Sequence, residues 1–200
     1  MKPTIQHHLL CAAGLVALAA VAAPAHAVSF EGAASAGNSV VTDYSDIGKM
    51  SFDLDLKDTR PVVISFRVDA SDLSMPIAFN AIVRNLIGVG LEQLSFTLSQ
   101  SSFNSVGTVT RSFGGSTLAI GAGSHSVALS FVGPEFLDLE IGNALGSTPA
   151  ATDWTLAQSG FQPGDRYTLT VAAVVPEPES YALMLAGLGL VGWLARRRSR

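Results

Sequence analysis

Apolar and polar residues alternate along several short stretches in the middle of the chain. Over residues 50–57 apolar side chains occupy every second position, and Ser, Asp and Lys occupy the positions between them. The same period of two recurs over residues 62–68, 77–84, 94–99, 127–131 and 167–171. Because successive side chains of a strand point to opposite faces, each stretch predicts a β-strand with one buried face.

Weaker alternation predicts further strands over residues 103–113, 117–120, 136–141 and 154–156. Gly133-Pro134 is expected to end the strand that begins at Val127, and residues 143–153 are expected to form a long loop. Short strands between turns rich in Gly, Pro, Asn and Asp, without a helical apolar stripe, predict an all-β domain. We expect a jelly-roll-like antiparallel β-sandwich over residues 28–174.

The first 27 residues have the pattern of a secretory signal peptide. Lys2 precedes an apolar run over residues 9–23, and Ala25 and Ala27 supply the small residues that signal peptidase requires. We therefore expect cleavage between Ala27 and Val28. Cleavage also removes Cys11, the only cysteine, so the exported domain is expected to hold together by packing without disulfides.

The C-terminal residues 175–200 form a third region. Pro176, Glu177 and Pro178 precede an uncharged run over residues 181–195, and four arginines follow it: Arg196, Arg197, Arg198 and Arg200. This pattern predicts a short transmembrane helix with its arginines in the cytoplasm and the β domain outside. The run extends only about 22 Å, against about 30 Å for a hydrocarbon core, which predicts a weak or temporary anchor.

A proline–glutamate–proline tripeptide, a short apolar helix and a terminal arginine cluster resemble the PEP-CTERM sorting signal of Gram-negative bacteria. The resemblance implies that exosortase, an inner-membrane protease-transferase, recognises the sorting motif Pro176, Glu177 and Pro178 and removes the tail. It also implies transient anchoring in the inner membrane, then delivery to the cell surface or the extracellular matrix of a host that makes exopolysaccharide and biofilm. An ordinary membrane anchor is the alternative, but it leaves the two prolines unexplained.

Two further segments resemble one PEP-CTERM subfamily, whose signature is FxDxF. Residues 42–46 lead into the strand at Phe52, with Tyr44 in place of the first Phe and Ile47 near the second aromatic position. Residues 164–171 resemble the closing strand of that subfamily. The resemblance supplies no catalytic residues.

The charge of the domain limits its partners. Residues 28–175 contain fourteen acidic and seven basic side chains, a net charge of −7. A nucleic-acid partner requires a basic surface, so we expect none. Mild acidity suits an exported soluble domain.

Few residues offer catalytic or metal-binding chemistry. His125 is the only histidine after the signal peptide, and no Gly-x-Ser-x-Gly motif accompanies it, so we expect an exposed histidine at a strand end rather than a catalytic base. One imidazole without a thiol cannot build a zinc site. Gly187 to Gly192 match Gly-x-Gly-x-x-Gly but lie inside the apolar run, without the strand that a dinucleotide site needs.

Acidic residues leave two weaker possibilities open. Calcium could be held by five aspartates that lie close in sequence, although their spacing matches no EF-hand: Asp43, Asp46, Asp53, Asp55 and Asp58. Asp138 and Glu140 are two residues apart and could form an acid pair, although glycosidase carboxylates usually converge from different strands. We expect solvated faces in both places, and no cofactor.

These patterns predict a non-catalytic surface or matrix protein, associated with exopolysaccharide, that signal peptidase and exosortase process. The first alternative is a carbohydrate-binding module, which would display exposed aromatic side chains. Outside the tail, only Tyr44, Trp154 and Tyr167 are Tyr or Trp. A secreted hydrolase is a further alternative, disfavoured because no nucleophile motif accompanies His125.

Overall fold

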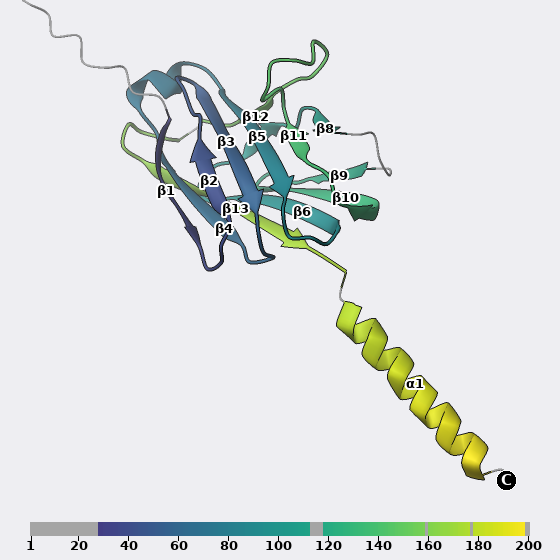
Figure 1. Ribbon diagram of the computed structural model, residues 1–200. Coiled ribbons are helices and arrows are strands. Elements are labelled where there is room, and N and C mark those ends of the chain that lie inside the picture. The colour runs from purple at the N-terminus through teal and green to yellow at the C-terminus, as the bar shows by residue number, and fades with distance from the viewer. Residues whose placement is uncertain (1–27, 113–117, 159, 177, 199–200) are drawn as a thin grey trace, which may run out of the picture.

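The computed structural model describes residues 28–112, 118–158, 160–176 and 178–198 of the chain. Two β-sheets pack face to face, and one helix follows them at the C-terminal end (Figure 1). The prediction of an all-β domain is confirmed.

The first sheet has six strands. Their order across the sheet is β1 (Ser29–Ser35), β4 (Val62–Arg67), β13 (Arg166–Val174), β6 (Leu91–Leu98), β10 (Ser126–Glu135) and β9 (Leu118–Ala122). All of its neighbouring strands run antiparallel.

The second sheet has seven strands. Its main path is β2 (Val40–Asp43), β3 (Lys49–Leu56), β5 (Ile77–Asn85), β11 (Leu139–Ile141) and β8 (Val109–Arg111). Two short strands complete it: β12 (Trp154–Leu156) pairs with β5, and β7 (Phe103–Ser105) pairs with β12.

One strand pair contradicts the prediction of a wholly antiparallel sandwich. β3 and β5 are parallel over their full length, with Lys49 opposite Ala78 and Leu56 opposite Asn85. The intervening strand β4 lies in the other sheet, so the chain crosses the sandwich and returns before it begins β5. Because the chain passes from β3 to the opposite sheet and back again, β5 runs in the same direction as β3. A jelly-roll connection is not confirmed.

The outer edge of β5 carries a strand in two halves. β11 lies opposite Val83 to Ala81 and β12 opposite Phe79 to Ile77, so both run in one direction along this edge. The chain between them makes an excursion over residues 143–153, which confirms the predicted loop. Asn80 of β5 holds the start of this loop against the strand, because its side-chain oxygen accepts a hydrogen bond from the Asn143 backbone N–H at 3.0 Å.

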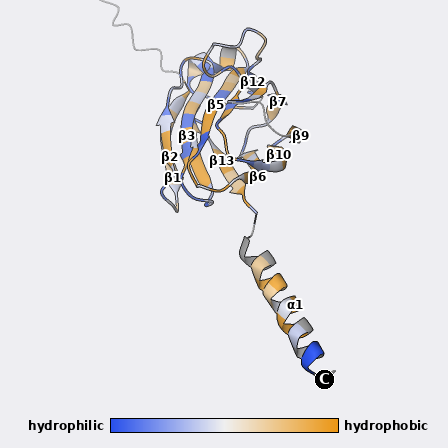
Figure 2. Ribbon diagram, turned by 45° about the vertical axis from the view of Figure 1, so that its right-hand side comes forward, coloured by the Kyte–Doolittle hydropathy of each residue, from blue (hydrophilic) through white to orange (hydrophobic). Residues whose placement is uncertain are grey.

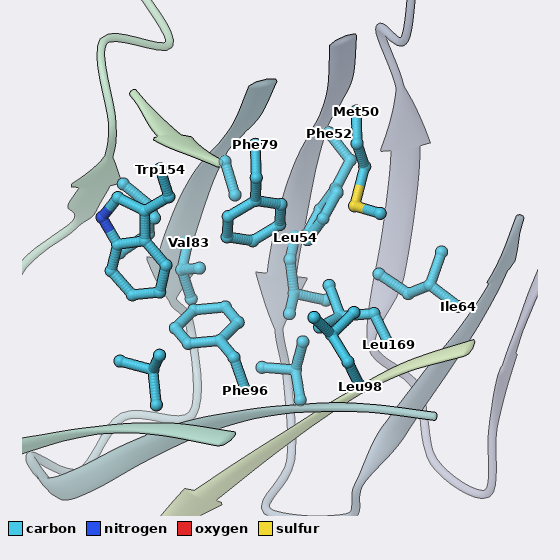
Figure 3. Close-up of a cluster of buried hydrophobic side chains, with 14 of the residues drawn as sticks. Met50, Phe52, Leu54, Ile64, Phe79, Val83, Phe96, Leu98, Trp154 and Leu169 are labelled. Carbon is cyan, nitrogen blue, oxygen red and sulfur yellow. The ribbon is translucent and has the colours of Figure 1, made fainter. Parts of the chain in front are cut away.

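The core confirms the alternation in the sequence. Phe52, Leu54 and Leu56 of β3 are buried between the sheets, while Asp53 and Asp55 lie on the outer face. Trp154 is fully buried and lies 5.6 Å from Phe79 and 5.7 Å from Phe96, measured between ring centres (Figure 3). Phe79 belongs to one sheet and Phe96 to the other, so this aromatic cluster joins the two layers.

Several boundaries differ from the predictions. The alternation did not predict β1 or β2. β1 is interrupted near Gly32, where the pairing with β4 shifts register, and β2 has only four residues. β10 does not end at Gly133-Pro134 but continues to Glu135 through an irregular segment after Ser130. A 3-10 helix, Ala70–Ser74, occupies the connection between β4 and β5. The region 103–113 contains two short strands, β7 and β8, where the alternation predicted one.

Candidate functional site

The C-terminal tail leaves the domain directly from a core strand. β13 ends at Val174, two residues before Pro176, as expected because proline has no backbone N–H with which to extend a strand ladder. Glu177 lies outside the described residues. Helix α1 spans Pro178–Arg198, so it begins at the second proline and extends beyond both ends of the uncharged run 181–195. Proline fits there because the first helical residue needs no backbone N–H.

The described apolar side chains of α1 do not pack on the domain. Leu183, Met184 and Leu185 are 73%, 56% and 65% exposed. Three successive residues, each turned by about 100°, point to nearly all sides of a helix, so no single stripe faces the sheets. Figure 1 accordingly shows α1 projecting from the domain. Gly187 and Gly189 lie within this helix with open space around them, which is no dinucleotide-binding turn.

The predicted transmembrane helix is not confirmed. In the part of the chain that the structure describes, no helix combines the length and apolarity needed to cross a membrane.

The arginine cluster lies in the last turn of α1. Arg196, Arg197 and Arg198 belong to the helix, whereas Arg200 lies outside the described residues. The Arg197 guanidinium carbon lies 5.6 Å from the centre of the Trp193 ring, within reach of a cation–π interaction. Positive side chains suit a helix C-terminus, which carries a partial negative charge. Figure 2 shows this hydrophilic end beyond the apolar part of the helix.

The predicted signal peptide, with Ala25 and Ala27, lies outside the described residues. Val28, the predicted first residue after cleavage, is buried beside the start of β1. Cleavage after Ala27 stays a prediction.

His125 lies in the turn between β9 and β10 and is exposed, as the sequence predicted. Its Nδ1 is within hydrogen-bond distance of the Ser101 backbone oxygen. No described contact joins it to an acid or to a hydroxyl nucleophile.

The five aspartates proposed for calcium do not converge on one point. Asp43 and Asp46 accept hydrogen bonds from the neighbouring backbone N–H groups of Ser45 and Ile47. Asp58 accepts the backbone N–H groups of Asn38 at 2.6 Å and Arg60 at 3.0 Å. No group of three or more potential metal ligands occurs among the described residues.

Asp53 and Asp55 are brought together by a residue that sequence reasoning missed. Arg84 of β5 forms ion pairs with both, at 2.8 Å between its Nη1 and Asp55 Oδ1. The hydrogen bond to Asp55, followed by that to Asp53, raises the pKa of the Arg84 guanidinium. Opposite charges on predicted strands hinted at such a pair, but the parallel register that creates it could not be read from the sequence.

A pocket of about 440 Å³ opens beside Arg84 on the outer face of the seven-stranded sheet. It contains Asp138 and Glu140, the proposed acid pair, together with Thr110, Ser112 and Arg111; Ile82 and Leu145 add apolar surface. Glu140 is not free, because its Oε1 accepts the Leu145 backbone N–H at 2.9 Å.

Among the described residues of the domain, the Trp and Tyr side chains do not form the flat exposed surface that many carbohydrate-binding modules use. Trp154 and Tyr167 are buried in the core. The Trp154 indole N–H donates to the Thr108 backbone oxygen at 3.2 Å, so its polar edge is also satisfied inside the domain. Tyr44 is exposed but stands at the β2–β3 connection, away from the pocket.

A family model described as the PEP-CTERM protein-sorting motif matches residues 174–199. The match begins at the last residue of β13 and covers the two prolines, α1 and the arginines. No curated protein and no solved structure matches the chain. Most of the matched segment is α1, whose described apolar side chains are exposed and not packed on the sheets. The chain is therefore a protein with a PEP-CTERM sorting signal, the type of tail that exosortase processes.

Proposed function

We propose that this protein is a non-catalytic component of the cell surface or extracellular matrix, sorted by exosortase and associated with exopolysaccharide. The match of residues 174–199 to the PEP-CTERM motif carries the proposal. The exposure of the described α1 side chains supports it, because a helix that does not pack on the core can be removed without unfolding the sheets.

The proposed route has three steps. Signal peptidase removes residues 1–27 during export. The apolar part of α1 then enters the lipid of the inner membrane, with the arginines on the cytoplasmic side. Its short length favours brief residence, because the bilayer must thin or the arginines must snorkel to accommodate it. Exosortase finally cleaves at the sorting motif and releases the domain outward.

Glu177→Ala tests this route, with Glu179→Ala as a matched control in the first turn of the helix. Both variants keep the apolar run and the arginines. We expect full-length Glu177→Ala protein to accumulate in the inner-membrane fraction of a host with exosortase, while Glu179→Ala is processed like the wild type. Equal processing of the two variants would contradict a sorting motif centred on Glu177.

The non-catalytic proposal rests on the described side chains. His125 faces a backbone oxygen, and Glu140 is engaged by the Leu145 backbone N–H. A hydrolase with an activated Ser or Cys nucleophile would need a base within about 3 Å of it. Screening the purified protein on polysaccharide and ester substrates tests this, and activity abolished by His125→Ala would overturn it.

The pocket beside Arg84 favours a second candidate, a carbohydrate-binding module. Arg84 is held in place by Asp53 and Asp55, and Glu140, Thr110 and Ser112 offer further hydrogen-bonding groups above the apolar Ile82. Sugars present hydroxyl groups and apolar ring faces, so they suit such a mixed surface. Binding of the host's purified exopolysaccharide by the wild type, lost in Arg84→Ala but kept in Arg67→Ala, would favour this candidate.

A further inference from the structure

Five large apolar side chains are exposed at the end of the domain where β13 continues into the tail. Leu86 and Val89 belong to the β5–β6 connection, Val132 and Phe136 flank the end of β10, and Val174 ends β13. Their exposed fractions are 52%, 40%, 75%, 60% and 47%. We call these residues the apolar rim. The described part of the domain exposes eleven large apolar side chains, so nearly half of them gather at this end.

Strand register places the rim residues at one end of the six-stranded sheet. Gln93 near the start of β6 lies opposite Ser130 of β10 on one side and Val174 of β13 on the other. Leu91, two residues earlier, lies opposite Glu135. The start of β6 and the ends of β10 and β13 therefore meet at the edge from which α1 departs (Figure 1).

Close contacts join the β5–β6 connection to the end of β10. A Cβ atom on Gly90 would lie 2.3 Å from Pro134 Cβ and 2.9 Å from the Phe136 ring, so both side chains lie directly over Gly90. The Asn85 side-chain N–H₂ donates to the Val89 oxygen at 2.8 Å and to the Glu135 oxygen at 3.1 Å. The rim is thus a built surface rather than a set of loose loop residues.

The short linker keeps Val174 of the rim close to the start of α1. Only three residues separate Val174 from Pro178, and four residue steps span at most about 14 Å. If α1 enters lipid at its first turn, Val174 lies within about this distance of the entry point, and the strand register places the other rim residues at the same end of the sheet.

We propose that the apolar rim docks on the lipid surface of the membrane that holds the tail. This inference rests on the proposed membrane anchoring. Apolar and aromatic side chains gain free energy at the interfacial layer in proportion to the apolar area removed from water. Neither a short helix nor a small apolar surface holds a protein firmly, but two weak membrane contacts together do. Removal of α1 leaves the rim alone, so the domain is released.

Single-cysteine labelling tests the docking, because Cys11 is the only native cysteine. In a Cys11→Ser background, one cysteine is introduced at Val132 or Phe136 in the rim, at Leu188 in the tail, or at Tyr44 at the opposite end of the domain. The full chain is reconstituted in phosphatidylethanolamine–phosphatidylglycerol vesicles, and a lipid-borne doxyl group quenches an environment-sensitive fluorophore on the cysteine.

The labels separate the two claims. We expect quenching at Leu188, Val132 and Phe136 and none at Tyr44. Quenching at Leu188 with rim labels no more quenched than Tyr44 would overturn the docking and leave the membrane anchoring intact. An unquenched Leu188 would overturn both. A change in rim-label fluorescence without lipid quenching, seen only at high protein concentration, would assign the rim to a contact with a second copy. The same change seen only when exosortase is added would assign it to the enzyme. Either result would overturn lipid docking.

A variant pair provides an independent readout. Val132→Ser with Phe136→Ser removes exposed apolar area from the rim, and Ile47→Ser with Met75→Ser removes comparable exposed area from the other end. We expect the rim variant to lower the vesicle partition coefficient about tenfold while the control leaves it unchanged. Equal partitioning of both variants, with wild-type thermal melts, would refute the proposal.

Discussion

Tyr167→Phe examines a buried polar group of the core, the hydroxyl of a ring that packs on other aromatic rings. The Tyr167 ring is 1% exposed and packs on Phe66 and Phe161, with ring centres 5.7 Å and 5.5 Å away. Its hydroxyl is buried and has no hydrogen-bond partner among the described residues. Burial, and then the negative charge of Asp72, raise the pKa of Tyr167 above its ordinary value.

The substitution keeps the ring contacts and removes the unsatisfied hydroxyl. An unpaired buried polar group costs about 1–3 kcal/mol, so we expect Tyr167→Phe to raise the free energy of unfolding by about 1 kcal/mol and Tm by about 3 °C. This gain is opposite in sign to the usual effect of a core substitution.

A pH signature strengthens the test. Because the folded pKa lies above the unfolded value near 10, the unfolded chain loses this proton first as pH rises. Folding stability from Tyr167 is therefore complete below about pH 10 and falls by about 1.4 kcal/mol between pH 9 and pH 11. The Phe variant lacks this fall.

Chemical unfolding at pH 7, 9 and 11 measures both effects, with the exposed Tyr44→Phe as a control expected to match the wild type. Destabilisation of Tyr167→Phe by 1 kcal/mol or more at pH 7, with an unchanged alkaline slope, would show that the hydroxyl is hydrogen-bonded and refute the reasoning.

Two further predictions concern the domain. Leu54→Asp places a charge in the fully buried core and should lower the free energy of unfolding by about 3–5 kcal/mol. Asp53→Asn keeps the Arg84–Asp55 ion pair and should lower it by less than about 1 kcal/mol. Equal melting temperatures of the two variants would contradict the assigned faces of β3. The backbone N–H groups of Asn38 and then Arg60 lower the pKa of Asp58, so its contribution to folding stability is present above about pH 4 and is lost as pH falls. Asp58→Asn should therefore melt at a lower temperature than the wild type at pH 7 and lose less stability between pH 5 and pH 3. Equal losses of stability by the two proteins between pH 5 and pH 3 would contradict this prediction.

The period of two predicted the strands that have one buried and one charged face. Phe52 and Leu54 against Asp53 and Asp55 left little ambiguity, because a one-residue slip would bury two carboxylates. β1 and β2 escaped this reasoning, since both are edge strands that bury little: β1 carries Gly, Ala and Ser in place of a regular apolar face, and β2 has only four residues.

The pairing between strands that are distant in the chain could not be predicted from the sequence. The parallel contact of β3 with β5 depends on β4 lying in the opposite sheet, and the alternation of each strand is the same in either arrangement. For the same reason the Arg84 ion pairs and the nearby pocket could not be anticipated. The sorting tail was recognisable because its signal is local, with the motif, the apolar run and the arginines adjacent in the chain.

The processed ends of the exported protein test the central claim most directly. Wild-type protein is expressed in matched hosts with and without exosortase, and the intact mass of the protein in each fraction is measured. We predict that the exosortase host releases a chain that begins at Val28 and lacks α1 and the arginines, while the other host retains a chain ending at Arg200 in its inner membrane. Release of the same shortened chain from the host without exosortase would contradict the account.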